Sequence, residues 1–295
     1  MATKVQISRR LLMTMALAMP WSASRPARAE TGGIASLDYG LASTMLMLGI
    51  APAAVVARAD WQQWVVDPVM PESVADLGTA TEINLEVLAR LKPALILSTP
   101  FLAASRSRLE TIAPVREFDV YTGGGNALPA SFDATRQLGK LLQRENQAAD
   151  FLVRADATFE NCRRRIVRRP APPVALITMM DERHARIYGG PGLYQGTLER
   201  LGVKNAWQAE TNFWGFQTVA IEQLISLPDN AHLMIFEPLM PPDILLRLGD
   251  SPLWRNLPFV RAGRVSVLPG VLMFGMVREA MRFAELLTER LEQLS

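Results

Sequence analysis

The chain has 295 residues, 49% of them hydrophobic and 20% charged, which is ordinary for a globular protein and excludes a disordered or collagen-like chain. The formal net charge of +2 arises at the N-terminus: residues 1–29 carry five Lys and Arg and no acid, and removing these five from the 31 basic residues leaves 26 against 29 acidic ones. A mildly acidic body lacks the positive field that nucleic acid binding needs, so we expect no nucleic acid partner.

Residues 1–29 have the pattern of a secretory signal peptide. A basic start ends in Ser8-Arg9-Arg10, an apolar run from Leu11 to Trp21 follows, and Ala27-Arg28-Ala29 places small residues at the cleavage site. The apolar run is too short to span a membrane. The arginine pair is typical of a twin-arginine export signal, and a Sec signal containing two arginines is the alternative. We therefore expect the mature protein in the periplasm.

A first repeated pattern in the remaining sequence predicts a helix near the start of each half. In residues 40–49 and again in residues 192–202, a Gly-Leu pair and a Leu-Gly pair enclose a stretch of helical length. Glycine at the end of each stretch is typical of a helix C-terminus. The β-branched residues that follow, Ile50 and Val203, predict that a strand starts there.

A second repeated pattern predicts buried strands. Residues 84–93 and 221–228 each indicate a helix that ends at proline, and each precedes an apolar run, Ala94–Leu97 in the first half and His232–Phe236 in the second. Continuous apolar runs of this length are typical of strands inside parallel sheets. Helix and strand patterns alternate in both halves, so the fold class expected is α/β, with two lobes that have parallel-rich sheets.

One long helix is predicted between the halves. Residues 145–168 contain no Gly or Pro, and apolar residues, Cys162 among them, recur every three or four positions. At about 1.5 Å per residue this helix would be ~36 Å long, a stiff connection between two lobes. Prolines then end it before the strand Val174–Thr178. The predicted organisation is a signal peptide at 1–29, an N-terminal α/β lobe at 30–144, a rigid connecting helix at 145–169 and a C-terminal α/β lobe at 170–295.

Sequence motifs of enzymes and metal sites are missing. There is no G-x-G-x-x-G, Walker A or G-x-S-x-G sequence, and neither His184 nor His232 has a Cys or His at metal-ligand spacing. We expect His232 to be structural, because it opens an apolar strand, and His184 to be exposed in a polar turn. Cys162, the only cysteine, is expected in the core. The prediction is therefore a non-enzyme with no covalently bound cofactor and no metal site of its own.

Aromatic residues gather in segments without helix or strand periodicity. Residues 205–216 contain four aromatic residues among amides and turn formers, and residues 61–64 contain two tryptophans. Loops on a rigid scaffold commonly carry binding sites. The sequence therefore predicts two aromatic segments that face each other across a ligand, with capping of the hydrophobic core as the alternative for each tryptophan.

At these residues the chain resembles the periplasmic ferric hydroxamate-binding proteins (ferrichrome type) of ABC importers. The matching segments are Asn205–Gly215, the longest, with Pro71–Gly78, Asn84–Glu86, Ile112–Pro114 and Pro258–Arg264. The resemblance implies a monomer with two α/β lobes joined by one long helix, the helical-backbone type of periplasmic binding protein. It also implies capture of an iron(III)–siderophore complex, hydroxamate type, and its delivery to an ABC permease in the inner membrane. The siderophore would hold the iron.

The resemblance implies a set of ligand-binding residues, with departures from the family pattern. Trp64, Trp207, Asn212 and Trp214 match family pocket positions, and Tyr39 stands where the family can carry a tryptophan. The ligand-binding candidates are Trp64, Trp214, Asn212, Trp207, Tyr39, Phe274, Leu102 and Tyr188.

The family's two polar anchors are absent, and so is one of its pocket tryptophans. Ala80 stands at the position of an arginine, Leu102 at that of a tyrosine and Leu272 at that of the tryptophan. Without the arginine, oxygens of the chelate would lose a charged donor. Either the siderophore differs or another arginine replaces it, and the candidates are Arg106, Arg108 and Arg278.

In this class a carboxylate at each lobe tip meets arginines of the permease, which implies Glu199 for the second lobe and Glu110, near Ser107, for the first. Two alternatives stay open. One is a binding protein for another bulky chelate, such as a cobalamin, haem or a carboxylate-type siderophore. The other is a siderophore-processing enzyme, which would need a serine near His184.

Overall fold

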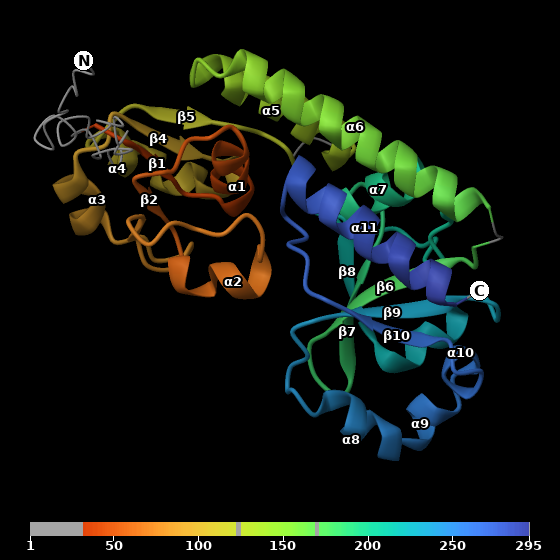
Figure 1. The fold of residues 1–295 in the computed structure, drawn as a ribbon. Coiled ribbons are helices and arrows are strands. Elements are labelled where there is room, and N and C mark those ends of the chain that lie inside the picture. Colours follow the sequence, from red (N-terminus) through yellow and green to blue (C-terminus); the bar gives the residue numbers. More distant parts are fainter. Residues whose placement is uncertain (1–31, 122–124, 169–170, 295) are drawn as a thin grey trace, which may run out of the picture. The chain divides into compact units, whose positions relative to one another are not determined.

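The computed structural model describes residues 32–121, 125–168 and 171–294 (Figure 1). The expected signal peptide at residues 1–29 lies outside these ranges. Within them, no helix is both long enough and apolar enough to cross a membrane.

The N-terminal half is built on a five-stranded parallel sheet in the order β3-β2-β1-β4-β5. Its strands are β1 (Ile34–Ser36), β2 (Ala54–Val55), β3 (Ala75–Asp76), β4 (Leu95–Ser98) and β5 (Val115–Glu117). The connecting helices are α1 (Tyr39–Met47), η1 (Arg58–Asp60), α2 (Trp61–Trp64), α3 (Leu85–Leu91), η2 (Pro100–Ser105) and α4 (Arg106–Glu110), where η denotes a 3-10 helix. The parallel order fits short strands separated by helices, as the alternating pattern predicts.

The C-terminal half has a mixed sheet in the order β10-β9-β6-β7-β8. Its strands are β6 (Val174–Met179), β7 (His184–Tyr188), β8 (Phe216–Ala220), β9 (His232–Phe236) and β10 (Val265–Leu268). Its helices are α7 (Leu193–Leu201), η3 (Ile221–Ser226), α8 (Ile244–Asp250), α9 (Pro252–Arg255), α10 (Pro258–Arg261) and α11 (Val277–Gln293). Strands β6, β9 and β10 are parallel, whereas β7 is antiparallel to β6 and β8 (Figure 1). The α/β class with parallel-rich sheets is confirmed.

Two helices, α5 (Ala127–Leu141) and α6 (Glu145–Val167), lie between the sheets in the chain. Helix α6 matches the long helix predicted for residues 145–168. Helix α5 packs mainly against α6, α7 and α11, whose apolar faces share one core with it. The predicted boundary at residue 144 therefore assigns α5 to the N-terminal lobe, although α5 packs on α6, α7 and α11, which follow that boundary.

The main apolar core is continuous across both halves. Leu41 in α1 and Leu97 in β4 belong to the same buried cluster as Phe159 in α6, Phe236 in β9 and Phe283 in α11. A close-packed core of this kind resists deformation, because any sliding of one element opens voids against the others. The expected burial of Cys162 is confirmed, since only 1% of it is exposed.

Some local predictions are wrong. The prediction of strands that start at Ile50 and Val203 fails: β2 starts at Ala54, and the segment after α7 forms only an isolated bridge between Asn205 and Val174. Residues 221–226, predicted as a helix that ends at proline, form the short 3-10 helix η3. Both helices bounded by glycine are confirmed, with Gly49 and Gly202 in the left-handed region after α1 and α7.

Candidate functional site

Six aromatic side chains from distant parts of the sequence pack together and form what we term the aromatic cluster. They are Phe101, Tyr121, Phe213, Trp214, Phe216 and Phe274. Trp214 is the hub: its ring centroid lies 4.7 Å from that of Phe213 and 5.4 Å from that of Phe274. Phe101 and Tyr121 of the first half approach it at 6.1 and 6.2 Å. Rings from both halves therefore meet at one residue.

The cluster presents large apolar surface to solvent. Phe101 is 59% exposed and Phe213 is 50% exposed, while Tyr121, Trp214 and Phe274 are partly exposed. Exposed aromatic rings that touch one another are uncommon on a monomer and mark binding surfaces more often than single exposed apolar residues do. This cluster is therefore the candidate binding site.

A tight turn fixes the orientation of Trp214. The Asn212 side-chain oxygen accepts hydrogen bonds from the backbone N–H groups of Trp214 (3.0 Å) and Phe216 (3.3 Å). Gly215 has φ of +81°, and a Cβ there would lie 2.2 Å from the Cα of Gly192, so no other residue fits. Asn212, predicted to bind ligand, thus shapes the turn with its side-chain oxygen and is exposed.

Residues 270–276 form the segment that holds Phe274, and this segment contacts both halves of the chain. The Tyr121 hydroxyl donates to the backbone oxygens of Met273 (3.0 Å) and Gly275 (2.6 Å). At Gly270 an added Cβ would lie 2.8 Å from the backbone oxygen of Glu237 and 3.2 Å from that of Gln63. Tyr121 therefore ties the segment that holds Phe274 to the first half of the chain.

Two carboxyl groups near this segment, those of Asp38 and Glu279, are shielded from water. Glu279, only 1% exposed, accepts a hydrogen bond from the Met276 N–H at 2.7 Å. Burial, and then the charge of Glu279, raises the pKa of Asp38 to about 6, against the opposing hydrogen bond from the Leu41 N–H. Burial also raises the pKa of Glu279. Burial raises the pKa of Tyr121, and the charges of Asp38 and Glu279 raise it further.

Tyr39 and Trp64 lie on a smaller apolar cluster beside residues 270–276. Both are partly exposed and pack against buried residues that include Trp61 and Leu272. The Tyr39 ring stands edge-on to Trp61 at 5.4 Å. Because Leu272 is two residues before Phe274, both predicted residues adjoin the segment that carries Phe274, which itself belongs to the aromatic cluster.

Three other predicted contacts lie in the core. Trp207 is 8% exposed, Tyr188 is 4% exposed and Leu102 is 8% exposed, and each belongs to a buried apolar cluster. Tyr188 packs edge-on against Tyr194 at 4.9 Å, and its hydroxyl bonds to Thr178. Their side chains pack in the interior, which leaves little of each surface for contact with a ligand.

The arginines proposed as replacements already have partners. Arg278 is 17% exposed and forms an ion pair with Asp67. Arg106 pairs with Glu110 at 2.9 Å and reaches Glu117 at 3.7 Å. Arg108 donates to the Ser105 hydroxyl at 3.4 Å. Among the described residues, the cation–π contacts with rings involve Arg186 and Arg200 and none of these three arginines.

Sequence reasoning did not predict three residues of this site as ligand contacts, Phe101, Tyr121 and Arg186. The guanidinium carbon of Arg186 lies 4.4 Å from the ring centroid of Phe216, within cation–π range. Arg186 gave little signal, because it lies in β7, a strand that the sequence did not predict. Tyr121 gave no local signal, because its role depends on contacts more than 150 residues away in the chain.

The two predicted docking carboxylates differ in their surroundings. Glu199 in α7 is exposed and accepts hydrogen bonds from the side-chain amides of Gln195 (2.8 Å) and Asn126 (3.1 Å). Glu110 is exposed and forms an ion pair with Arg106. Glu199 thus presents an uncompensated negative charge, whereas that of Glu110 is largely neutralised by its neighbour.

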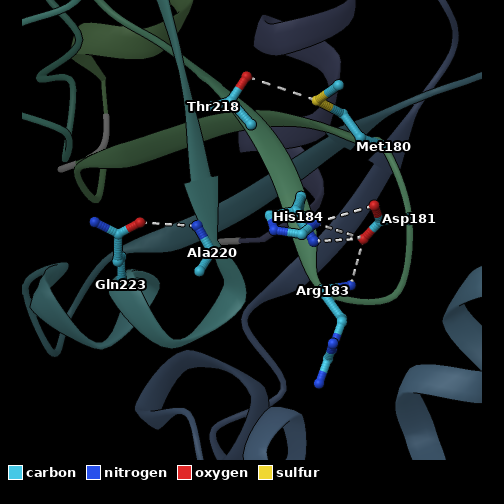
Figure 2. Close-up of polar contacts among 7 residues, drawn as sticks. All are labelled: Met180, Asp181, Arg183, His184, Thr218, Ala220 and Gln223. Carbon is cyan, nitrogen blue, oxygen red and sulfur yellow. Dashed lines mark hydrogen bonds and ion pairs between the residues drawn. The ribbon is translucent and has the colours of Figure 1, made fainter.

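The two histidines are bound into local structure. His184 opens β7, and its ring bonds to both carboxylate oxygens of Asp181, at 3.0 and 3.1 Å, in an exposed turn (Figure 2). His232 is buried and bonds to the Ser266 hydroxyl at 2.8 Å. In the part of the chain that the structure describes, no group of three or more His, Cys, Asp or Glu is arranged to hold a metal ion.

A cavity of about 480 Å³ lies away from the aromatic cluster. It is lined by residues that include Arg165, His232 and Arg264. Arg165 forms an ion pair with Glu292, and Arg264 donates to backbone oxygens of Ala231 and Asp229. Its main polar side chains are therefore engaged with the protein, which makes the aromatic cluster the better candidate.

Comparison with known proteins identifies the family. The family model for periplasmic binding proteins matches residues 34–272. The chain belongs to this family. It is 34% identical over 282 residues to the iron(3+)-hydroxamate-binding protein FhuD of Escherichia coli (strain K12), which covers 95% of this chain and 94% of that protein.

Solved structures of the periplasmic binding protein family agree with this assignment. The siderophore-binding protein FhuD from Vibrio cholerae with bound Fe3+–Desferal superposes with a TM-score of 0.83 at 28% identity, over 88% of this chain and 98% of that one. FhuD2 from Staphylococcus aureus with bound ferrioxamine B has a TM-score of 0.67 at 19% identity, over 89% of this chain and 98% of that one, which shows a shared fold.

Proposed function

We propose that the protein captures an iron(III)–siderophore complex of the hydroxamate type outside the cytoplasm, in the periplasm, and delivers it to an ABC permease in the inner membrane. The observation that carries this proposal is the aromatic cluster, in which rings from both halves meet at Trp214 and remain partly exposed. The identity to an iron(3+)-hydroxamate-binding protein over nearly the whole chain supports the choice of ligand.

The chemistry of a ferric trihydroxamate suits such a surface. The siderophore supplies the oxygen ligands of the iron, so the protein recognises the outside of the complex, which combines aliphatic linkers with anionic hydroxamate oxygens. Aromatic rings cover the aliphatic part and gain roughly 25 cal/mol for each Å² of apolar area removed from water, before the cost of association. The exposed rings of Phe101 and Phe213 and the hub Trp214 provide that contact.

Delivery to a permease requires a docking surface, and we assign Glu199 to it. Its carboxylate is exposed and held in place by two amide donors while keeping its full charge. Glu110 is the weaker counterpart, because Arg106 lies against it. The role proposed is binding and transfer by a monomer, without catalysis of a reaction on the siderophore.

The test is titration of the protein's tryptophan fluorescence with the ferric complex of Desferal, a trihydroxamate. Saturable quenching is expected, and Trp214→Ala is expected to raise Kd about 10-fold or more, as for aromatic anchors that a bound partner covers. The matched control is Trp254→Phe, because Trp254 is buried among α8–α10 residues apart from the aromatic cluster. Absence of saturable quenching in the wild type would contradict the proposed ligand class.

A further inference from the structure

Arg186 projects from β7 toward the aromatic cluster. Its guanidinium carbon stacks over Phe216 at 4.4 Å, and Phe216 in turn lies 6.3 Å from Phe274, centroid to centroid. One terminal nitrogen, Nη1, lies 3.6 Å from the sulfur of Met273, in the segment tied by Tyr121. The side chain is only partly exposed, so its charge sits at the edge of the cluster and close to the rings proposed to bind ligand.

The charge of Arg186 has no acidic partner. Among the ion pairs of the described ranges, none includes Arg186, and its Nε is buried without a hydrogen-bond acceptor. Its close polar neighbours are neutral, the Met273 sulfur and the hydroxyl of Tyr188. Burial raises the pKa of Tyr188, against the hydrogen bond with Thr178 and the charge and hydrogen bond of Arg186. A buried guanidinium N–H without an acceptor costs free energy, which an anionic ligand oxygen would recover.

Two of the three replacement arginines proposed from the sequence are neutralised by acidic neighbours. Arg278 is paired with Asp67, and Arg106 with Glu110. Ala80 in the first half is partly buried among apolar residues and supplies no charge. Arg186 is thus a cation that stands beside the rings without an acidic partner among the described residues, and its Nε has no acceptor.

We propose that Arg186 determines the specificity of this site by donating to the anionic hydroxamate oxygens of the ferric complex, a contact made from the second lobe. The inference rests on the proposed function and deepens it. A hydroxamic acid is neutral in the free siderophore and loses its proton when it binds iron. An arginine that donates to these oxygens therefore strengthens binding of the iron-loaded siderophore more than binding of the free one. Stacking on aromatic rings does not distinguish the two forms.

The experiment compares Kd values for the ferric complex of Desferal and for iron-free Desferal in three variants, measured by calorimetry. Arg186→Met keeps the apolar packing over Phe216 and removes the charge, and Arg186→Lys keeps the charge without the planar fork of donors. The matched control is Arg183→Met. Arg183 is exposed in the turn between β6 and β7, and Figure 2 shows its side chain extending away from Thr218 and His184.

The expected result is a loss of about 10- to 100-fold in affinity of Arg186→Met for the ferric complex, with iron-free Desferal changed less than about 3-fold. Arg186→Lys should lie between wild type and Arg186→Met, and Arg183→Met should match wild type. Should Arg186→Met fail to fold, the same comparison on Arg186→Lys decides, with a loss confined to the ferric complex expected.

Two results would overturn the inference while leaving the proposed function intact: an unchanged affinity of the Arg186 variants for the ferric complex, or an equal loss for the ferric and iron-free forms. The second would show that Arg186 only supports the packing of the site. Failure of the wild type to bind the ferric complex at all would remove the proposed function, and the role of Arg186 with it.

Discussion

Replacement of Asp38 by asparagine tests how much the charge of this shielded carboxyl group, near residues 270–276, destabilises the folded protein. Asp38 caps α1 through a 2.8 Å hydrogen bond from the Leu41 N–H, and asparagine caps a helix equally well. The pKa of Asp38 is raised from 3.8 to about 6 by burial and by the charge of Glu279. At roughly 1.36 kcal/mol per pKa unit, this corresponds to about 3 kcal/mol of destabilisation when Asp38 is ionised.

The effect has a defined pH range. The pKa of Asp38 in the folded state lies above the value in the unfolded chain, so the native state binds the proton more tightly and loses stability when the group ionises. The loss is absent below about pH 3.8 and complete above about pH 6, the two pKa values of the group. Asp38→Asn should therefore be more stable than wild type at pH 7.5 and lose this advantage as the pH falls toward 4.

The size expected at pH 7.5 is about 1–2 kcal/mol, because asparagine also gives up about 0.3–1 kcal/mol of favourable charge–dipole energy at the start of α1, and Asp38 is partly exposed. Urea unfolding at several pH values measures it. The control is Asp243→Asn, at an exposed acid whose pKa is lowered by the hydrogen bond from Arg247. That variant should show no gain at pH 7.5. An Asp38→Asn variant with the pH dependence of wild type would refute the reasoning.

Three further predictions concern the site and its docking surface. Gly215→Ala should lower the free energy of unfolding by about 2 kcal/mol or more, because Gly192 leaves no room for a Cβ; thermal unfolding would show this, with Gly249→Ala, in open space, as the harmless control. Tyr121→Phe should cost about 1 kcal/mol of stability and weaken binding of the ferric complex several-fold, measured by urea unfolding and calorimetry; unchanged affinity would mean that the Phe274 segment does not need this tie. Glu199→Lys should keep the Kd for the ferric complex and abolish ligand-stimulated ATPase activity of the reconstituted permease, and retention of that activity would contradict the docking assignment.

The sequence predicts best where local pattern and long-range packing agree. The stretch of residues 145–168, which contains no Gly or Pro, predicts α6 almost to the residue, since its apolar spacing also matches the face that packs on α5 and α11. Glycines after α1 and α7 predict both C-termini, because the backbone there takes positive φ. The antiparallel strands β7 and β8 escaped prediction, since residues 184–188 alternate with a charged residue and gave no continuous apolar run.

The site was only partly predictable for the same reason. Trp214 stood out because turn formers surround it, and Asn212 and Gly215 do form that turn. Trp207 lies in the same segment, yet its ring is buried against the second sheet, and sequence periodicity cannot tell a ring that caps the core from one that faces solvent. Arg186 depends on which charges lack partners, and that is known only once ion pairs such as Arg278 with Asp67 are located.

Equilibrium dialysis of the purified protein against the ferric complex of Desferal, with radioactive iron as the tracer, tests the central claim most directly. The account predicts saturable retention of one complex per chain, displaced by excess unlabelled ferric complex and reduced in Trp214→Ala. Retention that never saturates, or no retention of iron in the wild type, would contradict the claim that this chain is a receptor for ferric hydroxamates.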